Sequence, residues 1–343
     1  MVSAPIAGLL ALSAPLIMGF QNFDDHSRST HYAARDYASN FLNSVDKNAI
    51  IFTYGDNDTY PLWYAQEVEG IRTDVRVVNL SLIAVDWYIN QMRRKVNESP
   101  AIKMTIPEDG YRGFKRDQVP VYSPAGSPRE MNIKDAVRFI GENHPVSAGG
   151  GMSFESYLPT TSLYIDVDPN KIKSMGILGA NDTIVSRVSM NLGDKTSLLK
   201  DDLAVMDIVA SNAFDRPIYW AVTCQANKLL GLQDYLRLEG LALRLVPVKT
   251  SGDGSFGIIG SGSVDLQRTH DDFMNKFKWG GFDNHRTYVD RSYLPSVQSH
   301  KLVLARAVSD ALRKGEKKIA VDLLDKYFQA FPNENFPYDF NAL

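Results

Sequence analysis

The amino-acid sequence predicts an α/β protein: a Rossmann-like, mostly parallel sheet with flanking helices, followed by a tetratricopeptide-like helical hairpin. Short apolar runs of β-forming residues alternate with helix-period segments between residues 32 and 96, and the alternation returns between residues 161 and 248. The 343 residues, of which 44% are hydrophobic, are enough for a sizeable core and roughly two domains of about 150 residues each.

The chain opens with an uncharged stretch, MVSAPIAGLLALSAPLIMGF, at residues 1–20. A membrane-spanning helix needs roughly 20 such residues, and it tolerates Pro5 and Pro15 better than a soluble helix does. A signal peptide would begin with basic residues, which are absent here. We expect the end of a transmembrane helix, and therefore the membrane as a partner; a buried core helix is the alternative.

Charged residues crowd the next segment, which would lie just outside that membrane. Asp24, Asp25, His26 and Arg28 form the cluster. His26 and Arg28 would contact a lipid phosphate, or the whole cluster is a solvated helix junction. The sequence leaves both readings open.

The clearest structural pattern follows at residues 32–96. A helix is expected at 32–45, a buried strand at 48–55, a helix from 58 to 69, a strand at 74–82 and a helix at 85–96. Strand, helix, strand and helix with short connections indicate a βαβ unit with a parallel sheet and a right-handed crossover.

An acidic loop, YGDNDTYPLWYAQEVEG, joins the first of these strands to its helix. Loops at the carboxyl ends of parallel strands are where open α/β sheets bind ligands. Carboxylates and amides suit a hard cation or sugar hydroxyls, but two carboxylates do not complete a cation shell, so we predict no metal site. In the competing interpretation, Asp58 caps the helix and Asp56 supports the turn.

Further residues join this candidate site by position. Trp63 would stack on a sugar ring or pack into the core, and Asn79 and Ser81 end the neighbouring strand and would lie beside the loop. The complete set of predicted ligand-binding residues is Asp56, Asn57, Asp58, Thr59, Trp63, Asn79 and Ser81.

The centre of the chain continues the α/β pattern after an irregular stretch at residues 100–151. Helices are expected at 132–144, 200–214 and 229–240, and strands at 161–168, 186–193, 216–224 and 241–248. The first sheet therefore continues or a second lobe packs against it, and residues 21–290 form the α/β region.

Residues 291–343 predict two amphipathic helices joined at Gly315. Ala320, Leu324, Tyr327 and Phe331 have the spacing of a tetratricopeptide unit. A single hairpin cannot stack as a solenoid, so we expect it to dock on the α/β body or on a partner.

Several functional classes are disfavoured. The net charge of −3 and the lack of basic runs argue against nucleic acid as a partner. Cys224 is the only cysteine, which excludes an internal disulfide, and its apolar surroundings predict a buried thiol. The chain has no nucleophile elbow, HExxH motif or dinucleotide fingerprint, so we predict no cofactor and assign no catalytic residue; His270, His285 and His300 receive no role.

Several blocks carry a family resemblance, among them QNFDDHSRST, GDNDTYPLWYAQEVEGIRTDVRVVN, RPIYWAVT and YLRLEGLALRLVPV. They resemble the soluble C-terminal part of domain-of-unknown-function family 2723, whose members are multi-spanning membrane proteins with protein O-mannosyltransferases among their eukaryotic relatives. The resemblance implies that glycosyl transfer from a lipid-linked sugar occurs in an N-terminal helix bundle. It also implies that the soluble part faces the periplasm or lumen.

This chain departs from that pattern because it has at most one spanning segment, so we expect it to lack the catalytic membrane part. Its expected task is to position an acceptor protein or the lipid-linked donor. The alternatives are a stand-alone carbohydrate-binding or small-molecule enzyme domain that uses residues 56–58, and a protein-interaction module that uses the helical hairpin.

Overall fold

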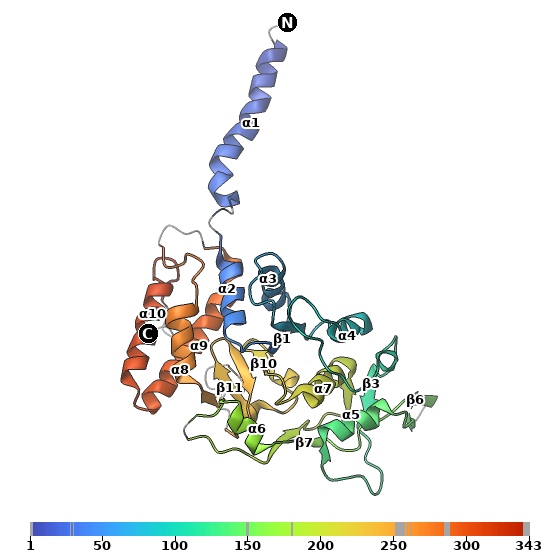
Figure 1. The fold of residues 1–343 in the computed structure, drawn as a ribbon. Coiled ribbons are helices and arrows are strands. Elements are labelled where there is room, and N and C mark those ends of the chain that lie inside the picture. The colour runs from blue at the N-terminus through green and yellow to red at the C-terminus, as the bar shows by residue number, and fades with distance from the viewer. Residues whose placement is uncertain are drawn as a thin grey trace.

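The computed structural model describes residues 3–27, 29, 31–148, 151–179, 181–250, 258, 260, 262–284 and 289–338. Its central feature is a six-stranded sheet in the order β13-β11-β12-β10-β1-β2 (Figure 1). The strands are β1 Ile50–Thr53, β2 Arg76–Asn79, β10 Ile218–Ala221, β11 Leu236–Glu239, β12 Ala242–Leu245 and β13 Ser263–Val264.

The sheet is mixed. β2, β1 and β10 run parallel, as do β11 and β13, whereas β12 is antiparallel to both of its neighbours. The α/β class is therefore confirmed, with a mixed sheet where a mostly parallel one was predicted. β1, β2 and β10 are buried along their whole length, which explains their unbroken apolar character in the sequence.

The predicted βαβ unit is present. It consists of β1, α3 Asp56–Glu67 and β2, and it is flanked by α2 Ala33–Asn43 and α4 Asp86–Met92. α2 and α3 pack against each other, and the apolar side chains of α2, such as Phe41 and Leu42, are fully buried. α7 Lys200–Asn212 leads into β10 and is buried along most of its length.

Smaller elements lie on one flank of the main sheet (Figure 1). They are β3 Gln118–Pro120, β4 Met131–Asn132, β5 Val146–Ala148, β6 Met152–Phe154, β7 Ser162–Asp166, β8 Arg187–Asn191, β9 Ser197–Leu199, α5 Ile133–Gly141 and α6 Pro169–Ser174. α5 packs on α7, and one continuous hydrophobic core joins this region to the main sheet. Short 3₁₀ helices occur at Glu108–Gly110, Ala226–Lys228, Gln233–Tyr235 and Arg291–Tyr293.

The helix predicted at residues 229–240 is wrong. A 3₁₀ turn at Gln233–Tyr235 leads into β11, which forms a tight hairpin with β12 through Gly240 at φ +53°. Leu236 and Leu238 alternate with Arg237 and Glu239, which is the two-residue period of a strand. All four are buried, the charged pair because the two side chains bind each other.

The C-terminal segment contains α8 Leu266–Asp271, a π-helical turn Asp272–Lys276, α9 Leu294–Arg313 and α10 Lys317–Ala330. α9 and α10 form the predicted helical hairpin and pack on α8 and the π turn, beside α2 (Figure 1). The likeness of the hairpin to a tetratricopeptide unit stays a prediction.

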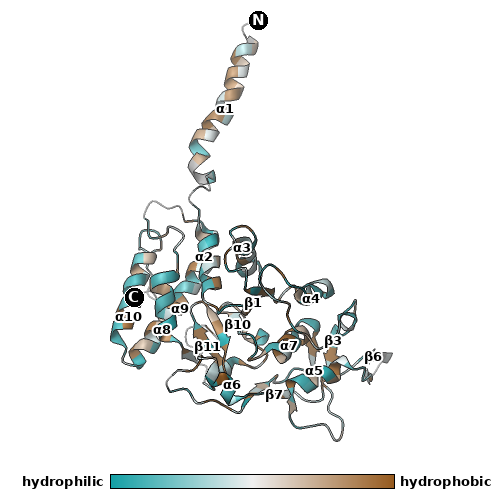
Figure 2. Cartoon of the chain, viewed as in Figure 1, coloured by the Kyte–Doolittle hydropathy of each residue, from teal (hydrophilic) through white to brown (hydrophobic). Residues whose placement is uncertain are grey.

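α1 Ser3–His26 projects away from the body as a single helix (Figure 1). In the described part of the chain it is the one helix long and apolar enough to cross a membrane; its stretch Ala4–Phe23 has a mean hydropathy of 1.5 and no buried residue. Figure 2 shows hydrophobic residues distributed along it. By length and composition, then, it suits an anchor in a bilayer.

Candidate functional site

The carboxyl ends of β1, β2 and β10 lie at one edge of the sheet because the three strands are parallel. α3 begins at this edge after β1, and α4 begins there after β2. We call this region the carboxyl edge. It is the location at which open α/β sheets bind ligands.

Asp58 lies at the centre of the carboxyl edge and is only 3% exposed. Tyr37 of α2 donates its hydroxyl to Oδ1 at 3.1 Å, and Thr223, just after β10, donates to Oδ2. Burial raises the pKa of Asp58 and raises that of Tyr37 well above its ordinary value. Asp58 therefore joins α3 to α2 and to the segment that follows β10, which is 165 residues away.

This position rules out the predicted capping role of Asp58. The residue before α3 is Gly55 at φ +80°, and no side chain caps the helix. Thr59 instead donates its hydroxyl to the carbonyl of Gly55 at 2.8 Å, within the first turn.

A second polar network links β1, α3 and β2. The hydroxyl oxygens of Thr53 and Thr59 are 2.7 Å apart, and Nδ2 of Asn79 donates to Thr59 at 3.1 Å. The Asn79 side-chain oxygen accepts the main-chain N–H of Ser81 at 2.7 Å. All but Ser81 are buried, so this network holds the edge together from within.

The remaining predicted residues form an exposed rim. Asp56, Asn57 and Ser81 are exposed, whereas Trp63 is half-buried and packs against the core. The structure thus brings the seven predicted residues to one edge but divides them into a buried frame and an accessible rim. Their role as ligands stays a prediction.

A cavity of about 340 Å³ opens on the carboxyl edge, within the size range of small-molecule sites. Val222, Thr223, Cys224, Gln225 and Ala226 form one wall after β10, and Ile258, Ser299 and Leu302 line it elsewhere. Thr223 lines the cavity and donates its hydroxyl to the buried Asp58 carboxylate, which does not itself line it.

Cys224 faces this cavity but has the properties of a structural thiol. It is 6% exposed, its Sγ lies 3.5 Å from the carbonyl oxygen of Phe52, and burial raises its pKa. A raised pKa leaves the thiol protonated and weakly nucleophilic near neutral pH.

Sequence reasoning missed Tyr37, Thr223 and Ser299. Thr223 could have been identified from the sequence, because it ends the apolar run RPIYWAVT. The acidic loop stands in the same position, directly after the apolar run at residues 50–53. Tyr37 and Ser299 lie on helices, and nothing in their local sequence connects them with β1.

The membrane-proximal cluster is only partly described. His26 lies in the last turn of α1, with Nδ1 2.9 Å from the carbonyl oxygen of Asn22. The side chains of Asp24 and Asp25, and the whole of Arg28, lie outside the described residues. Contact with a lipid phosphate therefore stays a prediction.

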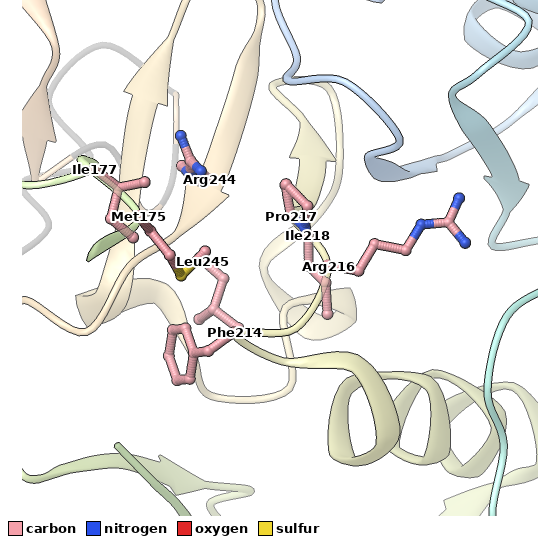
Figure 3. A pocket seen from close by; sticks show the side chains of 8 residues that line it. All are labelled: Met175, Ile177, Phe214, Arg216, Pro217, Ile218, Arg244 and Leu245. Carbon is pink, nitrogen blue, oxygen red and sulfur yellow. The ribbon is translucent and has the colours of Figure 1, made fainter. Parts of the chain in front are cut away.

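Two other possibilities find no support. In the described parts of the chain, no three His, Cys, Asp or Glu side chains gather as metal ligands. A second cavity, at the amino end of β10, is lined by Arg216, Arg244 and apolar residues (Figure 3), but its volume of about 10 Å³ holds at most one water molecule.

Comparison with known proteins identifies the family. Residues 34–268 match the model of TMEM260-associated domain 2. The chain belongs to this family. The matched residues include all six strands of the main sheet, so the TMEM260-associated domain contains that sheet and the acidic loop.

Two relatives carry the name protein O-mannosyl-transferase TMEM260. The Mus musculus protein is 33% identical over 92 residues, which are 26% of this chain and 13% of that protein. The Dictyostelium discoideum protein is 24% identical over 147 residues, 41% of this chain and 16% of that protein. The chain thus spans a minor part of the relatives it matches, and no solved structure matches it. An O-mannosyltransferase-related family, as the sequence motifs indicated, is confirmed at this coarser level.

Proposed function

We propose that this chain is the periplasmic or lumenal part of a membrane protein related to protein O-mannosyltransferases, anchored through α1. Its carboxyl edge would position the acceptor protein or the lipid-linked sugar donor, while bond breaking takes place elsewhere. This proposal rests on the family membership, on the apolar helix α1 and on the cavity at the edge.

The position of the cavity relative to α1 is the observation that carries the proposal. Residues 27–32 join α1 to α2, and six residues span roughly 20 Å at most. The amino-terminal half of α2 reaches the carboxyl edge, where Tyr37 contacts Asp58. A ligand in the cavity would therefore lie near the bilayer surface, where a lipid-linked sugar and an extramembrane acceptor meet.

The chemistry of the edge favours positioning over catalysis. Asp58 is buried and already accepts two hydroxyl donors, and the Cys224 thiol is protonated. A general base has to reach the proton it removes, and the buried carboxylate is separated from the cavity by Thr223.

Filling the cavity tests this proposal. Ala226→Trp should weaken binding of a short-chain polyprenyl-phosphate mannose, or of a folded acceptor domain, by roughly tenfold or more, because the indole occupies space that the ligand needs. Asn227→Trp is the matched control, since Asn227 is exposed on the same 3₁₀ turn but does not line the cavity. Titration of the full chain in nanodiscs gives the affinities.

Two results would contradict the proposal. In one, neither probe binds the unsubstituted chain. In the other, both variants bind with the affinity of the unsubstituted chain, which would mean that the cavity is not used.

A stand-alone carbohydrate-binding domain is the second candidate, favoured by the exposed pair Asp56 and Asn57. For this function, Asp56→Ala combined with Asn57→Ala should abolish binding of a soluble manno-oligosaccharide while the melting temperature stays unchanged, because neither side chain is buried. Isothermal titration and a thermal melt measure the two quantities. Unchanged sugar binding by the double variant, or none by the parent, would exclude this candidate.

A further inference from the structure

Exposed aromatic side chains gather on α3, on α4 and just before α2. Tyr60 and Tyr64 of α3 are 49% and 44% exposed, Trp87 of α4 is 58% exposed, and Tyr32 is 45% exposed. Together with the half-buried Trp63 they form what we call the aromatic face.

Ring contacts link the α3 and α4 parts of this face through Tyr88, which is itself buried beneath them. The Tyr60 and Trp63 rings are 5.7 Å apart, and Tyr88 lies 6.4 Å from Trp63 and 5.6 Å from Trp87. Single exposed aromatic residues are common on protein surfaces, but a contiguous group usually marks an interaction site.

Charged groups connect the aromatic face to the start of α2. The Arg35 guanidinium lies over the Tyr32 ring at 4.3 Å and pairs with Asp36 at 2.9 Å. Asp36, with a smaller contribution from Glu69, raises the pKa of Arg35, and Glu69 accepts the hydroxyl of Tyr64 at 2.7 Å. Figure 1 shows α3 beside the end of α2 that connects to α1. Tyr32 and the α3 part of the aromatic face are therefore on the side of the molecule from which the apolar helix leaves.

We propose that the aromatic face rests on the lipid bilayer, in the interfacial region of the leaflet that α1 enters. Tyrosine and tryptophan prefer this region because their rings are apolar and their polar groups remain hydrated. The inference rests on the proposed function only in that α1 is taken to span the membrane. It adds a second contact, which sets the orientation of the body and the height of the cavity above the lipid.

The charges around the face specify the kind of lipid surface. Asp56 lies beside Tyr60, and Glu67 and Glu69 are exposed at the end of α3. The Arg35 guanidinium over Tyr32 is already paired with Asp36, so these carboxylates outnumber it. These carboxylates would be repelled by anionic headgroups. The face therefore suits a neutral, zwitterionic surface, on which it binds through its rings.

A site-specific fluorescent probe tests the contact. The full chain would carry an environment-sensitive dye at Tyr60→Cys or Trp87→Cys, in nanodiscs of phosphatidylcholine with and without a spin-labelled lipid that quenches near the headgroups. The native Cys224 is buried, and labelling of the unsubstituted chain measures its background. Leu312→Cys is the matched control, because Leu312 is 58% exposed near the far end of the 20-residue helix α9, roughly 30 Å along. A probe at Leu12→Cys in α1 reports membrane insertion.

We expect the Tyr60 and Trp87 probes to be quenched at least threefold more than the Leu312 probe, in neutral lipid and without a requirement for anionic lipid. Equal quenching at Tyr60, Trp87 and Leu312, with strong quenching at Leu12, would overturn the inference and leave the proposed anchor intact. Absence of quenching at Leu12 would overturn both. If the Tyr60 probe responds to a soluble manno-oligosaccharide and not to lipid, the face binds glycans and the inference is wrong.

Discussion

Tyr37 lies between two buried titratable side chains, Asp58 and His300. Its hydroxyl binds Asp58, and its ring is 5.7 Å from that of His300. Burial raises the pKa of the acid and lowers that of the histidine to about 4, so burial favours the neutral form of both. The side chains under the carboxyl edge therefore lie in a low-dielectric interior.

Asp58 makes a pH-dependent contribution to the free energy of unfolding, and a single substitution should remove it. Because its folded pKa is raised, ionised Asp58 costs stability near neutral pH, and that cost disappears as the pH falls through the folded pKa. Asp58→Asn should thus be at least as stable as the parent at pH 7, and the difference should shrink toward pH 4. Asp58→Ala should lose about 1–3 kcal/mol, because Tyr37 and Thr223 lose their acceptor.

Urea unfolding at several pH values measures these differences. Asp56→Asn is the control, since Asp56 is exposed and should change the free energy of unfolding by less than about 0.5 kcal/mol at every pH. If the parent instead loses stability relative to Asp58→Asn on acidification, the predicted direction of this pH dependence is wrong.

The β11–β12 hairpin is held by a buried ionic cluster around Glu239, which is fully buried. Its carboxylate accepts from Arg237 at 2.6 Å, from Arg268 at 2.8 Å and from the Tyr219 hydroxyl at 2.9 Å. Arg268 and Arg244 also bind Asp46, in the turn after α2. The cluster ties the antiparallel half of the sheet to the βαβ unit.

Neutralising Glu239 should destabilise the protein strongly, because several buried guanidinium groups would lose their shared counter-charge. We expect Glu239→Gln to lower the free energy of unfolding by about 3–5 kcal/mol. Asp182→Asn, whose carboxylate is 3.5 Å from Arg237 at the partly exposed rim, should cost less than about 1 kcal/mol. Similar midpoints for both variants in urea would argue against a cooperative cluster.

The ionic cluster around Glu239 also explains why a helix was wrongly predicted at residues 229–240. In LLGLQDYLRLEG the leucines recur at helical spacings, and the charges at Arg237 and Glu239 suggest a solvent-exposed face. The buried charges of the strand pair with each other and also with Arg268 and Tyr219, which are distant in sequence. The βαβ unit was predictable because its apolar runs and its terminating glycines are local features.

The candidate site, too, could be predicted from the sequence only where it depends on local features. The acidic loop could be located from the sequence because it follows a strand directly. The cavity could not, because its walls come from the segment after β10 and from α9, and these meet only when β10 pairs with β1.

At the scale of the whole molecule, we expect the folded body to be stable without α1 but not without the hairpin of α9 and α10. α1 is unburied along its apolar stretch, whereas α9 and α10 bury residues such as Val303, Leu304 and Leu323 in the common core. Removing residues 1–26 should shift the melting temperature by less than about 2 °C, and removing residues 294–343 should lower it by more than about 10 °C or prevent folding.

Scanning calorimetry of the two truncated chains, in detergent for any chain that keeps α1, compares them with the parent. A chain without the hairpin that melts cooperatively near the parent temperature would show instead that α9 and α10 are an independent module.

The pairing of β1 with β10 has a consequence for biosynthesis. β1 and β2 are made early, but the strand that completes the parallel part of the sheet follows only after some 140 residues. At roughly 5–20 residues per second, the apolar edge of β1 waits about ten to thirty seconds for its partner. A nascent chain held at a membrane would spend that interval with an unpaired strand, so we expect mutations that slow the arrival of β10 to reduce yield more than their effect on the finished protein explains.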